Sequence, residues 1–218
     1  PAPPPSGQAP TAAWVLSRLR QIAPAEVAIV EEAPSHRSDL HDHFPITARG
    51  NGFLTGAGGV LGYGLPAAVG VALAQPDRQV IAILGDGSAM YSVQALYTAA
   101  EFTPNLKVIV LDNRGYAAVA LHARRAGVGE IPGTRLGGLD FAMLARAQGC
   151  EGRTVTSGED VEAALTALLA VPSAALLHIP VQNTPDDQDA APSSPGSGDL
   201  KRQPEQHIGA MKQPRGSQ

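Results

Sequence analysis

The chain has 218 residues, which is within the range of a single domain, and 44% hydrophobic against 17% charged residues allow a packed core. A net charge of −4 without a basic run gives no indication of a nucleic-acid or membrane surface. No stretch reaches the roughly 20 apolar residues of a membrane-spanning helix, and no signal peptide is recognisable. Cys150 is the single cysteine, so no internal disulfide can form and we expect a reducing, cytoplasmic compartment.

The two ends of the chain differ in composition from its centre. Residues 1–10 contain five prolines and are predicted to form an extended, Pro-rich linker. Residues 184–218 are rich in Pro, Gly, Ser, Gln and charge, so we expect a disordered polar tail. Residues 11–183 then form one compact domain. Because the chain opens with Pro1, we also expect it to be an internal piece of a longer protein.

Strands and helices are predicted to alternate along this domain. Pro66 suits the first turn of a helix, and Ser157 with Asp160 three residues later marks the start of another. In chain order we predict helix 11–22, strand 27–30, loop 33–58, helix 65–75, strand 80–84, helix 91–102, strand 108–111, a long loop, helix 140–148, strand 153–155, helix 158–170 and strand 174–179. Continuous apolar strands between helices predict an α/β fold, with a doubly wound, mostly parallel sheet and helices on both faces.

Side chains that suit a metal ion follow two successive strands. Residues 85–88 (GDGS) follow the first of these strands, and residues 112–115 (DNRG) follow the next. Ligands of such sheets bind beyond the carboxyl ends of the strands, and Mg²⁺ prefers carboxylate, amide, carbonyl and phosphate oxygens. Asp86 and Asn113 are therefore candidate ligands of one cation. The glycines beside Asp86 let the backbone approach a phosphate group.

Each of these two residues also has a simpler interpretation. Asp86 suits an Asx turn, and Asn113 tolerates a left-handed turn, without any ligand. Taken singly, those interpretations are the more common. As a pair that ends successive strands, with glycine on both sides of Asp86, the two residues favour a shared cation.

These motifs resemble a known family. Gly85-Asp86-Gly87, followed after 25 residues by Asn113, is similar to the diphosphate-binding signature of thiamine-diphosphate enzymes. Residues 56–100 resemble benzoylformate decarboxylase and acetolactate-synthase-like proteins, and the resemblance extends over about residues 26–182. It implies the C-terminal, diphosphate-binding domain of such an enzyme, with thiamine diphosphate and magnesium as cofactors.

The resemblance assigns a role to individual residues. Magnesium is implied at Asp86, Asn113 and the Gly115 carbonyl. Leu61 stands where the family places the large apolar residue beneath the thiazolium ring, and the Gly59 carbonyl where it accepts from the 4′-amino group. The implied contacts with the cofactor are Ser35, His36, Gly59, Leu61, Gly85, Gly87, Ser88, Ala89, Met90 and Tyr116. Of these, Ser88 and the backbone of 87–89 are expected to hold the diphosphate.

Histidines outside this set have other interpretations. His41-x-His43 suggests a zinc pair, but no suitably spaced Cys or carboxylate completes a tetrahedral site. We therefore expect these two histidines and His36 in a solvated loop, in which His36 is the candidate for a position near the phosphate. His122 and the two arginines that follow the next residue are predicted in a mobile loop over the site, and His178 in a buried strand as a satisfied core residue.

The family's activating glutamate comes from a separate pyrimidine-binding domain on a neighbouring subunit. The 25 residues before the first predicted strand are too few for such a domain, so we expect no catalytic residue in this chain. Alone, it should bind magnesium and diphosphate but turn over little or nothing. The resemblance implies a dimer or tetramer that acts on a small 2-oxo acid, as a decarboxylase or as an acetolactate-synthase-like carboligase.

Two alternatives remain open. Gly56-x-Gly58-Gly59-x-x-Gly62 imitates the fingerprint of a nicotinamide-binding Rossmann domain, but the preceding ITARGNGFLT is polar and broken by glycine. Binding of NAD without magnesium would favour that alternative. The other is a non-catalytic, truncated paralogue that binds the cofactor or a partner chain only.

Overall fold

The computed structural model describes residues 3–4, 6–44, 52–155 and 157–182. The predicted disordered tail at 184–218 lies outside these ranges. In chain order the elements are α1 (Ala12–Ile22), β1 (Ala28–Glu32), the 3₁₀ helix η1 (Pro34–His36), α2 (Arg37–His43), β2 (Phe53–Thr55), α3 (Gly64–Ala74), β3 (Val80–Gly85), α4 (Asp86–Ser92), α5 (Ala95–Phe102), β4 (Leu106–Asp112), α6 (Ala117–Arg125), α7 (Phe141–Ala147), β5 (Glu151–Thr154), the 3₁₀ helix η2 (Gly158–Asp160), α8 (Val161–Ala170) and β6 (Ala175–Pro180).

The described strands form one six-stranded sheet in the order β2-β1-β3-β4-β6-β5, and every pairing in it is parallel. The predicted doubly wound α/β fold is confirmed. Strand order reverses between β1 and β3, because the chain places β2 on one side of β1 and β3 on the other. A reversal of this kind opens a crevice at the carboxyl ends of the strands, where ligands of such folds bind.

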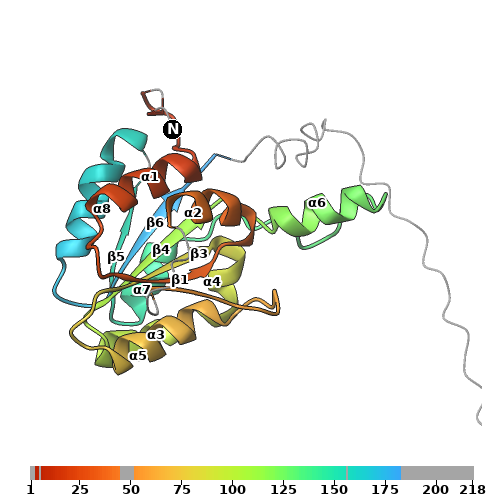
Figure 1. Cartoon of the computed structure of the whole chain (residues 1–218). Coiled ribbons are helices and arrows are strands. Elements are labelled where there is room, and N and C mark those ends of the chain that lie inside the picture. The colour runs from red at the N-terminus through yellow and green to blue at the C-terminus, as the bar shows by residue number, and fades with distance from the viewer. Residues whose placement is uncertain (1–2, 5, 45–51, 156, 183–218) are drawn as a thin grey trace, which may run out of the picture.

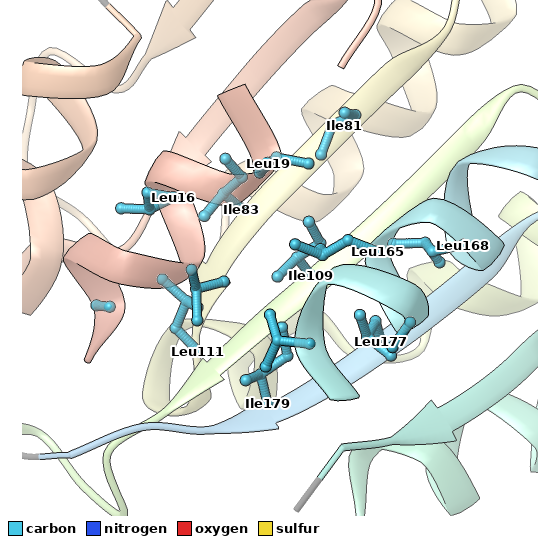
Figure 2. Packing of buried hydrophobic residues seen from close by; sticks show 14 of the residues in the cluster. Leu16, Leu19, Ile81, Ile83, Ile109, Leu111, Leu165, Leu168, Leu177 and Ile179 are labelled. Atoms are coloured by element: carbon cyan, nitrogen blue, oxygen red, sulfur yellow. The ribbon is translucent and has the colours of Figure 1, made fainter. Parts of the chain in front are cut away.

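Helices cover both faces of the sheet (Figure 1). Side chains alternate between the faces along each strand, so Ile81 and Ile83 belong to one core while Val80, Ala82 and Leu84 belong to the other. The first core lies beneath α1, α2 and α8. Figure 2 shows this core, in which leucines of α1 and α8 pack onto isoleucines and leucines of β3, β4 and β6.

The second core lies beneath α3, α5 and α7. Its outer surface is unusual, because large apolar side chains stay exposed on these helices and on α4: Leu73, Tyr91, Tyr97, Phe102 and Met143. Among the residues that the structure describes, α1, α2 and α8 carry no exposed large apolar side chain. Exposed large apolar side chains are therefore present on α3, α4, α5 and α7 and, among the described residues, not on α1, α2 and α8.

Several predictions about loops were wrong. The predicted loop 33–58 contains η1, α2 and β2. In α2 a single residue, Leu40, is fully buried, so tertiary packing against α1 rather than a periodic apolar pattern stabilises this helix. Strand β2 pairs with β1 and forms one edge of the sheet. The glycine-containing segment 56–62 therefore does follow a strand, although this strand has only three residues and is partly exposed.

The predicted long loop after β4 contains α6, and His122 with Arg124 and Arg125 lies on this helix. In Figure 1 α6 extends away from the body of the domain. The predicted helix 91–102 is two helices that are interrupted at 93–94, and the first of them already begins at Asp86. Residues 86–88 are thus the first turn of a helix and not a free loop.

The predicted linker is partly described, and it contacts the domain. Gly7 has a positive φ of 73°, which interrupts an extended run. The Gly158 N–H donates to the Gln8 carbonyl, and the Gln182 N–H donates to the Pro10 carbonyl. The division of the chain at residues 10 and 183 stays a prediction. Within the described ranges, no helix combines the length and the apolarity that crossing a membrane requires.

Candidate functional site

A cavity of about 240 Å³ lies at the carboxyl ends of β1, β3 and β4, beside the reversal of strand order. Most of the site residues predicted from the sequence line it: Ser35, His36, Gly59, Leu61, Gly85, Asp86, Gly87, Ser88, Asn113, Gly115 and Tyr116. They come from four separate segments of the chain. The sheet brings them together because β3 pairs with both β1 and β4.

The oxygens predicted to bind a cation lie together. One atom of the Asn113 amide group lies 3.2 Å from Asp86 Oδ1 and 2.8 Å from the Gly115 carbonyl oxygen. With the NH₂ in that position, the amide donates a hydrogen bond to both. With its oxygen there, three oxygens face one another. Asp86 Oδ2 is buried without a hydrogen-bond partner. A donor set of this kind fits a hard cation such as Mg²⁺.

A tight turn fixes the Gly115 carbonyl. Arg114 adopts a left-handed conformation with φ 66°, and Gly115 pairs with Arg135 in an antiparallel bridge. The Leu136 N–H donates to the Arg114 carbonyl at 2.9 Å. A Cβ atom on residue 115 would lie 2.4 Å from the Thr134 carbonyl oxygen, so only glycine fits here. The bridge therefore holds the third oxygen in place before any ligand arrives.

Burial and a neighbouring negative charge disfavour the ionised form of Asp86. Its side chain is 2% exposed. Burial, followed by the negative charge of Asp112, raises the pKa of Asp86 from 3.8 to about 7. An ionised Asp86 is thus unfavourable in the ligand-free chain near neutral pH. A divalent cation beside it reverses the sign of that effect, since it stabilises the charged form.

The pKa of Asp112 shifts in the opposite direction to that of Asp86. Burial favours its neutral form, but hydrogen bonds from His178 and from the Arg114 N–H outweigh burial and lower the pKa of Asp112. The distance from His178 Nε2 to Asp112 Oδ2 is 2.9 Å. His178 is buried in β6, with its ring edge-on to Phe141, which confirms the prediction of a satisfied core histidine. Its partner Asp112 was not predicted.

An aromatic ring covers the first turn of α4. A Cβ atom on residue 87 would lie 2.4 Å from Cε1 of Tyr116, so Gly87 is required for this approach. The rings of Tyr116 and Tyr91 meet edge to face at 6.3 Å. Burial, with the nearby Tyr91 and Asp86, raises the pKa of Tyr116, so its phenol stays neutral. The backbone N–H groups at the start of α4 thus lie beneath a neutral ring.

The opposite wall of the cavity contains Gly59 and Leu61. The Tyr63 hydroxyl donates to the Glu31 carbonyl and accepts from the Gly56 N–H, which closes the loop in front of α3. The carboxylate of Glu32 accepts from two backbone N–H groups at the end of the same loop. The resemblance placed Glu32 in a segment, 31–36, that supplies phosphate or substrate contacts, and its hydrogen bonds to the glycine loop were not predicted.

Some predicted positions differ from expectation. His36 was expected in a solvated loop, but it is 2% exposed, because η1 turns it inward to line the cavity. Met90 is absent from the cavity lining as far as the described residues show, and packs against the core beneath α3 and α5. The Ala89 side chain is buried in that same core, and the expected contact of its backbone with the diphosphate stays a prediction. The exposed Val119 and His122 on α6 also line the cavity, and Val119 was not predicted.

The zinc interpretation receives no support. His41 lies edge-on to Phe53 at 5.3 Å between ring centroids. In the ranges that can be described, no group of three His, Cys, Asp or Glu side chains is placed to hold a metal. The site at Asp86 is of a different kind, because an amide and a carbonyl group are the other two candidate donors.

An all-parallel sheet whose strand ends surround a glycine-lined cavity with oxygen donors defines an α/β domain for a phosphate-bearing cofactor. The sequence profile of the family described as "Thiamine pyrophosphate enzyme, C-terminal TPP binding domain" matches residues 33–179. The chain belongs to this family. Its family resemblance is therefore confirmed, and the nicotinamide alternative is not supported.

Relatives of known name agree with this assignment. Benzoylformate decarboxylase of Pseudomonas aeruginosa is 39% identical over 168 residues, which cover 77% of this chain and 32% of the relative. The acetolactate synthase isozyme 2 large subunit of Escherichia coli is 35% identical over 177 residues, or 80% of this chain and 32% of the relative. A solved structure of 4-hydroxybenzoylformate decarboxylase from Rhodococcus jostii has 33% identity and a TM-score of 0.76, with 84% of this chain and 35% of that chain covered. The chain thus spans about a third of the length of these relatives.

The raised pKa of Asp86 predicts how the stability of the ligand-free chain depends on pH. Between 3.8 and about 7 the native state holds a proton that the unfolded chain has released, so stability falls as pH rises through this window. Asp86→Asn removes the ionisation. At pH values above this window we expect the variant to be more stable than the parent by roughly 1–3 kcal/mol. Urea unfolding at several pH values measures this; identical curves for the two chains would contradict the assignment.

Proposed function

We propose that this chain is the thiamine-diphosphate- and magnesium-binding half of a 2-oxo-acid decarboxylase similar to benzoylformate decarboxylase. The observation that carries the proposal is the convergence of Asp86, Asn113 and the Gly115 carbonyl beside the glycine-rich first turn of α4. Membership of the thiamine pyrophosphate family supports the cofactor. Names of relatives support the reaction class.

The two walls of the cavity would bind different parts of the cofactor. Asp86, Asn113 and Gly115 would hold magnesium. The Ser88 hydroxyl and backbone N–H groups in the first turn of α4, with Gly85 beside them, would hold the diphosphate. Across the cavity, Gly59 and Leu61 would face the rings, with Leu61 beneath the thiazolium. Ser35 and His36 line the same cavity and are the further candidates for contacts with the cofactor.

When bound, thiamine diphosphate would supply a carbanion nucleophile for the carbonyl carbon of a 2-oxo acid, and an electron sink that allows the carboxylate to leave as carbon dioxide. The residues of this chain bind and orient. Asp86 would be ionised beside the cation, which favours its charged form, and the neutral Tyr116 covers the first turn of α4. The proposed chemistry thus needs a proton-transferring glutamate from outside the described residues.

A pyrimidine-binding domain, on another chain or another part of a longer protein, is the proposed source of that glutamate. Relatives are about three times as long as the matched region, which supports a further domain. The apolar surface on α3, α4, α5 and α7 supports a large partner, because exposed aromatic and aliphatic side chains are stabilised by burial. The complete enzyme would be a dimer or tetramer.

A carboligase is the second candidate, favoured by the similarity to acetolactate synthase large subunits. The two candidates share the same cofactor site. They differ in the acceptor, which is a proton in the decarboxylase and a second carbonyl compound in the carboligase.

Removal of the charged ligand tests the metal and cofactor together. We expect the parent chain to bind thiamine diphosphate only with Mg²⁺, and Asp86→Ala to lose this binding because no other described carboxylate is assigned to the cation. Calorimetric titration with and without a chelator measures it. Asp140→Ala, which changes an exposed carboxylate that caps α7, is the matched control and should bind normally. Chelator-independent binding, or unchanged affinity of the Asp86 variant, would overturn the magnesium assignment.

The role of Leu61 is separable from binding of the diphosphate. Leu61→Ala should keep most of the affinity for magnesium pyrophosphate, since the residue lies on the opposite wall. It should slow exchange of the C2 proton of thiamine diphosphate after reconstitution with a pyrimidine-binding domain, because the support for the bent cofactor is lost. Exchange measured by NMR at the parental rate would exclude this role. No exchange in the reconstituted parent would instead favour a non-catalytic paralogue.

A further inference from the structure

Glu32 is a carboxylate buried at the carboxyl end of β1. It is 2% exposed, and burial is the main reason why its pKa is raised. A carboxylate in such surroundings requires hydrogen-bond donors. Its donors are the backbone N–H groups of Gly62 and Gly64 and the hydroxyl of Ser88. All three belong to segments that border the cofactor cavity.

The backbone turns closely around this carboxylate. The Gly62 N–H donates to Oε1, and the Gly64 N–H donates to Oε2. Gly62 has φ +99°, a conformation that residues with side chains rarely adopt. A Cβ atom on residue 64 would lie 2.7 Å from Glu32 Oε2, so glycine is needed there as well. Gly64 begins α3, whose N-terminus favours a negative charge.

The position of one cavity wall depends on this contact. Leu61 immediately precedes Gly62, and Gly59 lies two residues before Leu61; both line the cavity. The far end of the loop is fixed separately, by Tyr63 and the Gly56 N–H. Ser88, on the opposite wall, contacts the same Glu32 carboxylate. The Glu32 carboxylate therefore contacts both walls of the cavity, at Gly62 next to Leu61 on one wall and at Ser88 on the other.

We propose that Glu32 is a positioning residue, which fixes the cavity wall of Gly59 and Leu61 relative to the opposite wall at Ser88, where the diphosphate would bind. This inference rests on the proposed function and deepens it. Glu32 contacts the backbone and Ser88, and not the reacting atoms, so it is not a catalytic residue. Its effect differs between ligands, because pyrophosphate needs only the Ser88 wall whereas thiamine diphosphate needs both.

Glu32→Gln tests the inference. Glutamine keeps the shape but has one acceptor oxygen, so its NH₂ faces one of the two glycine N–H groups. We expect the affinity for magnesium thiamine diphosphate to fall by about tenfold or more, and that for magnesium pyrophosphate to change by less than about threefold. Calorimetry on the whole chain measures both ligands. The ratio of the two affinities is the readout, because a general loss of stability does not change it.

Lys107→Met is the matched control. Lys107 is 1% exposed in the first half of β4, away from the cavity, and its Nζ donates to the carbonyls of Pro104 and Ser173. Its replacement also removes a buried ionisable group. It should lower the melting temperature and leave the affinity ratio unchanged.

Other outcomes separate this inference from the proposed function. Equal losses for both ligands, or no loss for either, would overturn the positioning role of Glu32. A parent chain that binds magnesium pyrophosphate but not thiamine diphosphate would overturn the proposed function instead. Hydrogen exchange tests the contact in the unsubstituted chain, whether or not the variant folds. The Gly62 and Gly64 amides should be protected, and exchange of Gly62 at the rate of an exposed loop would contradict the proposal.

Discussion

A buried carboxylate for which the described residues provide no cationic partner is the constraint around which this site is organised. Asp86 lies beside a second carboxylate, and burial with that neighbour raises its pKa to about 7. Its Oδ2 atom has no hydrogen-bond donor among the described residues. A protein interior stabilises such a group poorly, whereas a divalent cation bridging it to a diphosphate stabilises it well. The ligand-free chain is thus destabilised at Asp86, and the proposed cation would relieve this cost.

Glu32 and Asp86 are both buried carboxylates, but they differ in how many of their oxygens accept hydrogen bonds from the chain. Both carboxylates are 2% exposed and lie at the carboxyl ends of buried strands of the same sheet: Glu32 is the last residue of β1, and Asp86 directly follows β3. Glu32 receives hydrogen bonds on both oxygens from within the chain, so it serves the fold of the adjacent loop. Asp86 leaves one oxygen unsatisfied and faces Asn113 and the Gly115 carbonyl. Parallel pairing of β3 with β1 and β4 places the two carboxylates on neighbouring strand ends.

The sequence predicted those features that depend on local pattern. Uninterrupted apolar runs identified β3 and β4, and the polar residues directly after them identified Asp86 and Asn113. Features that depend on tertiary contacts were missed: α2 buries only Leu40, so no periodic pattern reveals it. The partners of Glu32 lie about 30 residues away. Packing of Met90 against the second core was also not predicted, because it depends on α4 beginning at Asp86, which turns the fifth residue of that helix toward the core.

The location of the cation tests the account most directly. Crystals grown with thiamine diphosphate and Mn²⁺ in place of Mg²⁺ would show the ion by anomalous diffraction. We predict one ion bound by Asp86, the Asn113 amide oxygen and the Gly115 carbonyl at about 2.0–2.2 Å, with the diphosphate completing its shell. A cofactor bound while the Asn113 NH₂ still donates to Asp86, or an ion held by other residues, would contradict it.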